Sequence, residues 1–234
     1  MKNFSVLLLV FTSVAAVAQT LSVEQRVVKT EESEDVDSWT ARLDQDMESC
    51  MDSYSDFIKE TFKTKVEKRG KNILVAVKTQ FPELSDLRLD QRAIFAVESS
   101  GTSVSLTFSP GYDIHFGKDQ YKAEFAKGET FAKGFVRYHY QTYYEAQIKT
   151  IQDKIKSLQN DIDSNSKKTD KNNKAITDNK TDGETEKTRS KNEKMMRQNE
   201  QYTAESASKR TQITDLEAQL SKFNQALQKT LDYK

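Results

Sequence analysis

The 234-residue sequence is poor in the residues that build metal sites, disulfides and tight turns. It has one cysteine, two histidines, two prolines and seven glycines, and 36 basic side chains balance 36 acidic ones. A single cysteine excludes an intramolecular disulfide, and Cys50, His115 and His139 do not have zinc-ligand spacing. The formal net charge of zero argues against a dedicated nucleic-acid-binding protein, which normally carries a cationic excess. We therefore expect no cofactor, no metal and no nucleic-acid partner.

Residues 1–18 have the pattern of a secretory signal peptide. Lys2 precedes an apolar run from Phe4 to Phe11, and the segment ends in small residues up to Ala18. Such a run is too short to span a bilayer, and a small-residue site favours cleavage after Ala18. We expect export to the periplasm or the extracellular space, with no transmembrane segment in the mature chain.

Turn-forming residues divide the rest of the chain into two parts. Six of the seven glycines and both prolines fall between residues 70 and 134, and only Gly183 lies beyond them. This distribution predicts an α+β head domain over residues 19–129, followed by a long helical hairpin over residues 130–234.

The head is predicted to contain a small antiparallel sheet. Strands are expected at residues 21–29, 73–77, 93–98 and 103–108, and a further short strand at 112–116. The third and fourth of these should form a hairpin turning at Gly101. In the fourth, Val104, Leu106 and Phe108 alternate with Ser103, Ser105 and Thr107, which predicts one buried face and one wet face.

One amphipathic helix is predicted over residues 36–62, capped by Asp35 or Asp37. Its apolar residues recur every three or four positions: Val36, Trp39, Leu43, Met47, Cys50, Met51, Tyr54, Phe57, Ile58 and Phe62. Packed on the sheet, this stripe would close the core and bury Cys50 as a small apolar side chain.

The last hundred residues carry two heptad seams. The first consists of Ile148, Ile151, Ile155 and Leu158, and the second of Ile213, Leu216, Leu220 and Phe223. A break at Gly183 predicts an antiparallel coiled coil with its tip near residues 180–187, pairing Tyr144 with Phe223. Because one glycine costs only about 1 kcal/mol in a helix, a continuous helix whose seam joins chains into a homo-oligomer stays open as an alternative.

Two groups of side chains are candidates for interaction. Asp44, Glu48, Asp52 and Asp56 recur every four residues, which predicts an acidic outer helix face that either docks a basic partner or is simply solvated. The second group is aromatic and lies at the start of the hairpin: Phe131, Phe135, Tyr138 and Tyr143. These side chains either form a stacking platform for a ligand or dock the hairpin on the head. We favour docking, because tyrosine suits a half-wet junction.

No nucleophile elbow, H-E-x-x-H pattern or phosphate-binding glycine loop is present. The sequence therefore favours an exported, non-enzymatic interaction or scaffold protein of the cell envelope, whose coiled-coil hairpin reaches an envelope or outer-membrane protein partner. One alternative is a periplasmic holdase, because the arrangement is similar, as a fold-level analogy, to oligomeric chaperones with helical tentacles. Another is a head domain that binds a small ligand.

Overall fold

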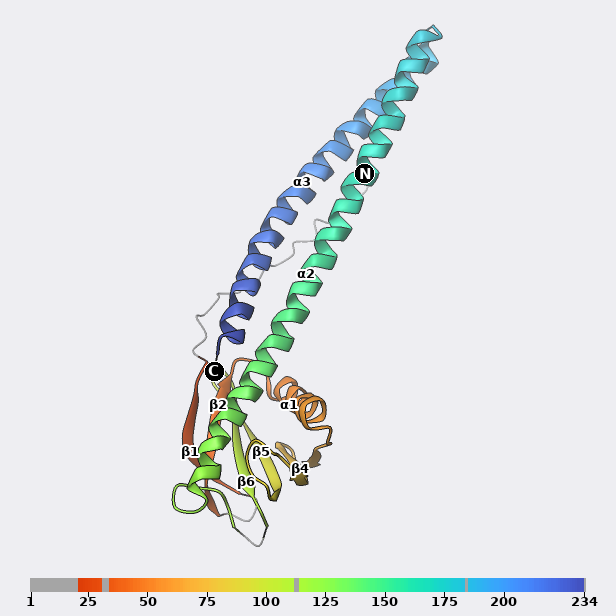
Figure 1. The fold of residues 1–234 in the computed structure, drawn as a ribbon. Coiled ribbons are helices and arrows are strands. Elements are labelled where there is room, and N and C mark those ends of the chain that lie inside the picture. The colour runs from red at the N-terminus through yellow and green to blue at the C-terminus, as the bar shows by residue number, and fades with distance from the viewer. Residues whose placement is uncertain (1–20, 31–33, 112–113, 184, 234) are drawn as a thin grey trace.

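The computed structural model describes residues 21–30, 34–111, 114–183 and 185–233, so the predicted signal peptide lies outside the described residues. These residues form an α+β head from which two paired helices project as a long stalk (Figure 1). The predicted fold class is thereby confirmed. Helices α2 (Lys122–Thr181) and α3 (Glu186–Leu231) form an antiparallel hairpin within one chain.

The head is built on one six-stranded antiparallel sheet. Its strands are β1 (Val23–Lys29), β2 (Asp35–Leu43), β3 (Glu67–Arg69), β4 (Ile73–Gln80), β5 (Arg88–Glu98) and β6 (Gly101–Ser109). They lie side by side in the order β1-β2-β6-β5-β4-β3. The chain leaves the β1–β2 hairpin through helix α1 (Met47–Phe62), crosses to the opposite edge, and returns strand by strand until β6 pairs with β2.

The predicted helix over residues 36–62 is wrong in its first third, because residues 35–43 form β2. In β2, Trp39, Ala41 and Leu43 enter the core on one face, which is the two-residue period of a strand. Trp39 and Leu43 of that series are four residues apart and therefore also fit helical spacing, which caused the error. Helix α1 begins at Met47, and its cap is Asp46, whose carboxylate accepts a hydrogen bond of 2.9 Å from the Ser49 N–H.

The predicted wet face of the β5–β6 hairpin is buried instead. Ser103, Ser105 and Thr107 are only 6%, 6% and 1% exposed. Strand β6 lies inside the sheet, where Ser105 is opposite Ile94 and Thr107 is opposite Arg92 on the neighbouring strand. The hydroxyls are satisfied within the sheet, since Ser105 Oγ and Thr40 Oγ1 lie 2.8 Å apart.

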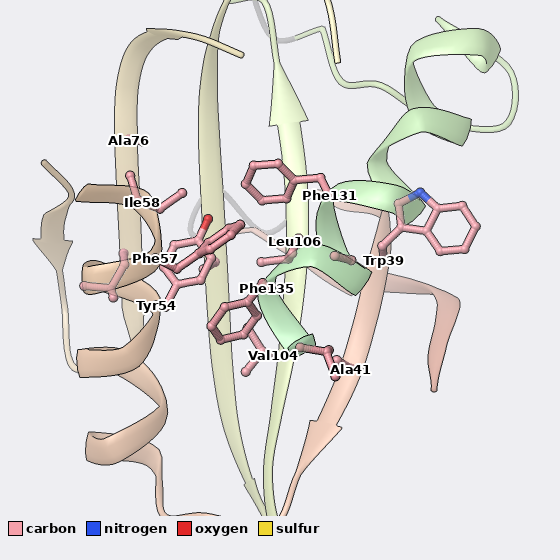
Figure 2. Packing of buried hydrophobic residues seen from close by; sticks show 14 of the residues in the cluster. Trp39, Ala41, Tyr54, Phe57, Ile58, Ala76, Val104, Leu106, Phe131 and Phe135 are labelled. Atoms are coloured by element: carbon pink, nitrogen blue, oxygen red, sulfur yellow. The ribbon is translucent and has the colours of Figure 1, made fainter. Parts of the chain in front are cut away.

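Helix α1 and the first turns of α2 cover one face of the sheet and enclose the core between them (Figures 1 and 2). Phe135 of α2 and Tyr54 of α1 are fully buried, and their ring centroids lie 5.0 Å apart at 78°. Helix α2 approaches the sheet closely at Gly128, where an added Cβ would lie 2.9 Å from both Trp39 and Phe108 side chains. The head core therefore includes the beginning of the stalk helix.

Helix α2 begins eight positions before the predicted start of the hairpin, at Lys122 instead of residue 130. The aromatic residue Phe125 accounts for the earlier start, because it stacks on Trp39 and its carbonyl accepts a 2.6 Å hydrogen bond from the indole N–H. Of the strand predicted at 112–116, residues 112–113 lie outside the described residues, and Ile114 forms a single bridge with Gly111.

The turn between α2 and α3 is where it was predicted. Gly183 has φ +95°, and Thr185 caps α3 in a reciprocal arrangement with Thr188. Near the head the predicted contact between Tyr144 and Phe223 is present, with ring centroids 6.0 Å apart. Farther out, Asn172 pairs with Asn199 and Asn179 with Asn192, which is offset by four positions, about one helical turn, from the register of Tyr144 with Phe223.

Candidate functional site at the base of the stalk

The link between β2 and α1 meets the stalk helix at a polar cluster. Gln45 is its centre: the backbone carbonyl accepts a 2.9 Å hydrogen bond from Thr102 Oγ1, and its side-chain Oε1 lies 2.7 Å from His139 Nε2. Cys50 Sγ lies 3.7 Å from the same carbonyl. One residue thus connects β6, α1 and α2, and the sequence patterns gave no signal for Gln45 or Thr102.

Tyr140 forms the second polar link of this cluster. Its hydroxyl donates to Asp44 Oδ1 at 3.1 Å and accepts from the Asp44 backbone N–H at 3.3 Å, although the side chain is only 1% exposed. Asp44 therefore lies in the connection before α1, and not on its acidic face as predicted. Glu48, Asp52 and Asp56 do lie exposed on α1.

A continuous series of rings joins the head core to the stalk. Phe135 is followed by His139 at 6.0 Å, His139 by Tyr140 at 5.0 Å, and Tyr140 by Tyr144 at 6.0 Å. Tyr144 then contacts Phe223 of α3. Aromatic contacts of this kind each add about 0.5–1.5 kcal/mol to burial, so the head and both stalk arms are coupled by packing.

The four aromatic residues proposed from the sequence divide between core and surface. Phe131 and Phe135 are buried at 5% and 0% exposure, so they hold the helix on the head and are not available as a stacking platform. Tyr138 is half-buried and donates a 2.9 Å hydrogen bond to Glu60 of α1, and Tyr143 is half-buried beside Tyr144. The structure thus agrees with docking at this end of α2.

Burial holds His139, Cys50 and Tyr144 of this region in their neutral forms. Burial lowers the pKa of His139 to about 4, and raises the pKa of Cys50 to about 12. Burial and then nearby Asp44 raise the pKa of Tyr144 to about 12. At neutral pH the site therefore contains an uncharged imidazole, a thiol and a phenol, none of which is poised as a base or nucleophile.

A small hollow opens beside this cluster at the end of the β5–β6 hairpin. Its volume is about 120 Å³, and it is lined by Arg42, Leu43, Asp44, Glu98, Ser100, Gly101, Thr102 and Tyr140. Arg42 and Glu98 form an ion pair of 3.2 Å in its wall. Pockets that enclose drug-sized ligands span roughly 300–1,000 Å³, so this hollow suits water or a small ion.

The outer part of the stalk is joined by amides in place of apolar side chains. Asn172 donates to Asn199 at 2.8 Å, and Asn179 donates to Asn192 at 2.7 Å. Asn165 and Ser206 are buried and 3.5 Å apart. Buried asparagines fix the register of paired helices at a cost in stability. The asparagine pairs of the distal stalk therefore set the register of its two arms but add little to its stability.

Two of the predicted seam residues are buried between the arms. Ile151 and Leu216 are 7% and 3% exposed, while the remaining predicted positions are partly exposed. Those are Ile148, Ile155, Leu158, Ile213, Leu220 and Phe223. A two-helix seam leaves the flanks of such side chains open to water, which explains their partial exposure.

We expect His139 to make stability depend on pH. An unfolded histidine titrates near 6.5, so between about pH 6.5 and 4 the unfolded chain binds the extra proton and folding weakens as the pH falls. The full stability is present above pH 6.5, and the loss reaches about 2–3 kcal/mol at pH 4. Denaturant unfolding of the wild type and of His139→Gln checks this, because the difference between them should shrink on acidification; a constant difference contradicts it.

No protein-family model matches the chain, and no significant match was found among curated proteins or solved structures. Within the described ranges, no group of three or more His, Cys, Asp or Glu residues is arranged to hold a metal ion. No helix in the same ranges has the length and apolarity needed to cross a membrane. The geometry of the head and stalk is therefore the basis for a functional proposal.

Proposed function

We propose that the chain is an exported, non-enzymatic interaction protein of the cell envelope, which presents its helical hairpin to a protein partner. The observation that carries the proposal is the course of α2. The same helix supplies Phe131 and Phe135 to the head core and continues without a break to Thr181. Its 60 residues correspond to about 90 Å at helical rise, most of it beyond the head.

The base of the stalk supports presentation of the hairpin in a fixed direction. Tyr140, His139 and Tyr138 tie α2 to the head through Asp44, Gln45 and Glu60 respectively. These links lie on different sides of the cluster, so tilting the stalk would break at least one of them. A rigid projection loses little conformational entropy when its distal end binds, which favours affinity.

The surface of the distal stalk is suited to recognition by polar contacts. Lysine, asparagine, threonine and glutamate dominate residues 164–210, and Lys168 lies 5.3 Å from the Tyr202 ring centroid. Mixed charges without a large apolar patch favour reversible, salt-sensitive binding over obligate assembly. The neutral, buried state of His139 and Cys50 also favours a structural role for these residues over a catalytic one.

Affinity capture from the native envelope fraction tests the proposal. The matched variant replaces residues 159–212 by the native turn 180–187, which keeps the head, the apolar seam and the ring series intact. We expect partners captured by the full stalk to be lost by this variant, while its head unfolds at an unchanged denaturant midpoint. Equal capture by both proteins would overturn the proposed role of the stalk.

A second variant separates the tip from the arms. Removing residues 165–178 together with 193–206 deletes two heptads from each arm, and it keeps the Asn179–Asn192 bond and the capped turn. The tip then lies about 21 Å closer to the head. Capture retained by this variant places the contact at the tip, and capture lost places it on the deleted arms.

A further inference from the structure

The two edges of the sheet are built differently. Edge strand β3 has three residues, Glu67–Arg69, all charged. Edge strand β1 has seven residues, Val23–Lys29, contains no proline, and has one lysine, at its last position. Short length, proline and charged side chains, lysine above all, keep a sheet edge from pairing with another strand; β1 is long and has no proline, and its charges are Glu24, Arg26 and the terminal Lys29.

Four of the seven side chains of β1 are exposed, and Val23, Arg26 and Val28 are partly buried. Val27 is 58% exposed, and Glu24 and Arg26 retain 54% and 34% of their side-chain exposure. Glu24 and Arg26 point to the face away from the helices, because they lie opposite Thr40 and Ser38 of β2. Their charged groups already meet there, with Arg26 Nε 2.7 Å from Glu24 Oε1, and Arg26 Nη1 also lies 3.8 Å from Glu98 Oε1.

The charge order along β1 is complementary to itself in one antiparallel register. When Gln25 lies opposite Gln25 of a second copy, Glu24 lies opposite Arg26 of that copy, and Arg26 opposite Glu24. The same register places Val23 opposite Val27 on the face that the helices cover. A shift of two residues in either direction would instead place arginine opposite arginine or glutamate opposite glutamate, which is unfavourable.

We propose that β1 is a dimerisation edge, where a second copy of this chain pairs antiparallel in the register centred on Gln25 and extends the sheet from six strands to twelve. The pairing satisfies the outward backbone groups of both edges. It also brings Glu24 and Arg26 of the two copies together on the face opposite the helices, where each Arg26 additionally pairs with Glu98 of its own copy.

This dimer would send the two stalks in opposite directions. Val23 is paired with Ala41, close to Asp44 and hence to Tyr140 at the stalk base, so β1 begins at the end of the sheet from which the stalk leaves (Figure 1). The two-fold axis of antiparallel pairing is perpendicular to the sheet. It rotates the second copy by 180° in the plane of the sheet, so the stalk of that copy leaves from the opposite end. The assembly then presents one stalk at each end.

Cysteine cross-linking of the chain from Gln19 tests the register. Gln25→Cys places two thiols on directly opposed residues, whose Cα atoms are about 4.5–5.5 Å apart in such a pair, within disulfide range. Lys29→Cys is the matched control, because its two copies would be separated by eight residues of strand, or about 26 Å. The native Cys50 is fully buried and stays in both variants.

We expect a dimer in sedimentation of the wild type at about 50 µM, a disulfide-linked dimer of Gln25→Cys, and none of Lys29→Cys. A monomeric wild type without cross-linking overturns the proposal and leaves the edge to a strand from another protein. Equal cross-linking of both variants also overturns it, because the contact would then lack the stated register.

Charge exchange provides the second test. Glu24→Arg replaces two attractive contacts of the dimer by two repulsive ones and should raise its dissociation constant about tenfold. The double variant Glu24→Arg/Arg26→Glu restores complementarity and should return the dissociation constant to within about twofold of the wild type. Thermal unfolding verifies that each variant folds, and identical dissociation constants for all three proteins contradict the proposal.

Discussion

Replacing Phe135 by alanine should lower the free energy of unfolding of the head by about 3–5 kcal/mol. The side chain is 0% exposed and lies between the sheet, Tyr54 and Phe57, with ring centroids 5.0 and 5.6 Å away. Its removal leaves a cavity where α2 meets α1, so the stalk base should loosen together with the core. Urea unfolding followed by Trp39 fluorescence measures the loss, because this tryptophan lies in the same core.

Phe223→Ala is the matched control for this prediction. It removes the same side chain from a helix, but Phe223 is partly exposed and contacts the ring of Tyr144 in the stalk. We expect it to cost about 1 kcal/mol in the stalk and to leave the head transition unchanged. Equal losses from both substitutions would contradict the assignment of Phe135 to a shared core.

Gly101→Ala should lower the free energy of unfolding about as much as Phe135→Ala, because the added Cβ would clash with backbone atoms. Gly101 begins β6 with φ +137°, and an added Cβ would lie 2.1 Å from the Leu43 carbonyl oxygen and 2.8 Å from the Asp44 Cα. Both atoms belong to backbone that also bonds Tyr140, so neither can move freely. We expect a loss of about 3–5 kcal/mol, measured by the same denaturant titration.

Gly70→Ala separates steric conflict from conformational strain. Gly70 also has positive φ, +64°, but nothing lies within 4 Å of its added Cβ. The left-handed conformation alone costs an alanine about 1–2 kcal/mol. If Gly101→Ala lowers the free energy of unfolding no more than Gly70→Ala does, then the Leu43–Asp44 backbone does not clash with a Cβ at position 101, which contradicts the prediction.

Much of the architecture could be predicted because it depends on local patterns. The heptads around Ile151 and Leu216 and the break at Gly183 indicate an antiparallel hairpin without knowledge of the head. Alternation from Val104 to Phe108 likewise indicates β6. Within one chain the two arms pack against each other as an intramolecular hairpin.

The errors have a common physical origin in long-range packing. Trp39 and Leu43 share a face in a helix and also in a strand, and pairing with β1 and β6 selects the strand. The burial of Ser103 and Ser105 depends on β6 lying inside the sheet, which no local pattern indicates.

The candidate site was predicted only in part, for the same reason. Tyr138 and Phe135 are recognisable from their spacing on α2. Asp44 and Gln45 lie in the link between β2 and α1, 96 and 94 positions before their partners Tyr140 and His139, and Thr102 lies in β6, 57 positions after Gln45. No local pattern indicates contacts over such separations. Asparagine pairs in the distal seam shift the register by about a turn from the one that the apolar residues alone favour.

The central claim is that α2 joins head and stalk as one rigid helix, and native-state hydrogen exchange tests it most directly. We expect amides of residues 137–148 to exchange as slowly as those of the head core, since ring packing and the Gln45 and Asp44 links hold that segment. Residues 165–206 should exchange faster, because their seam is polar. If the amides of residues 137–148 exchange fast while the head core and the stalk beyond them stay protected, α2 has a hinge at this segment. That result would contradict a rigid junction between head and stalk.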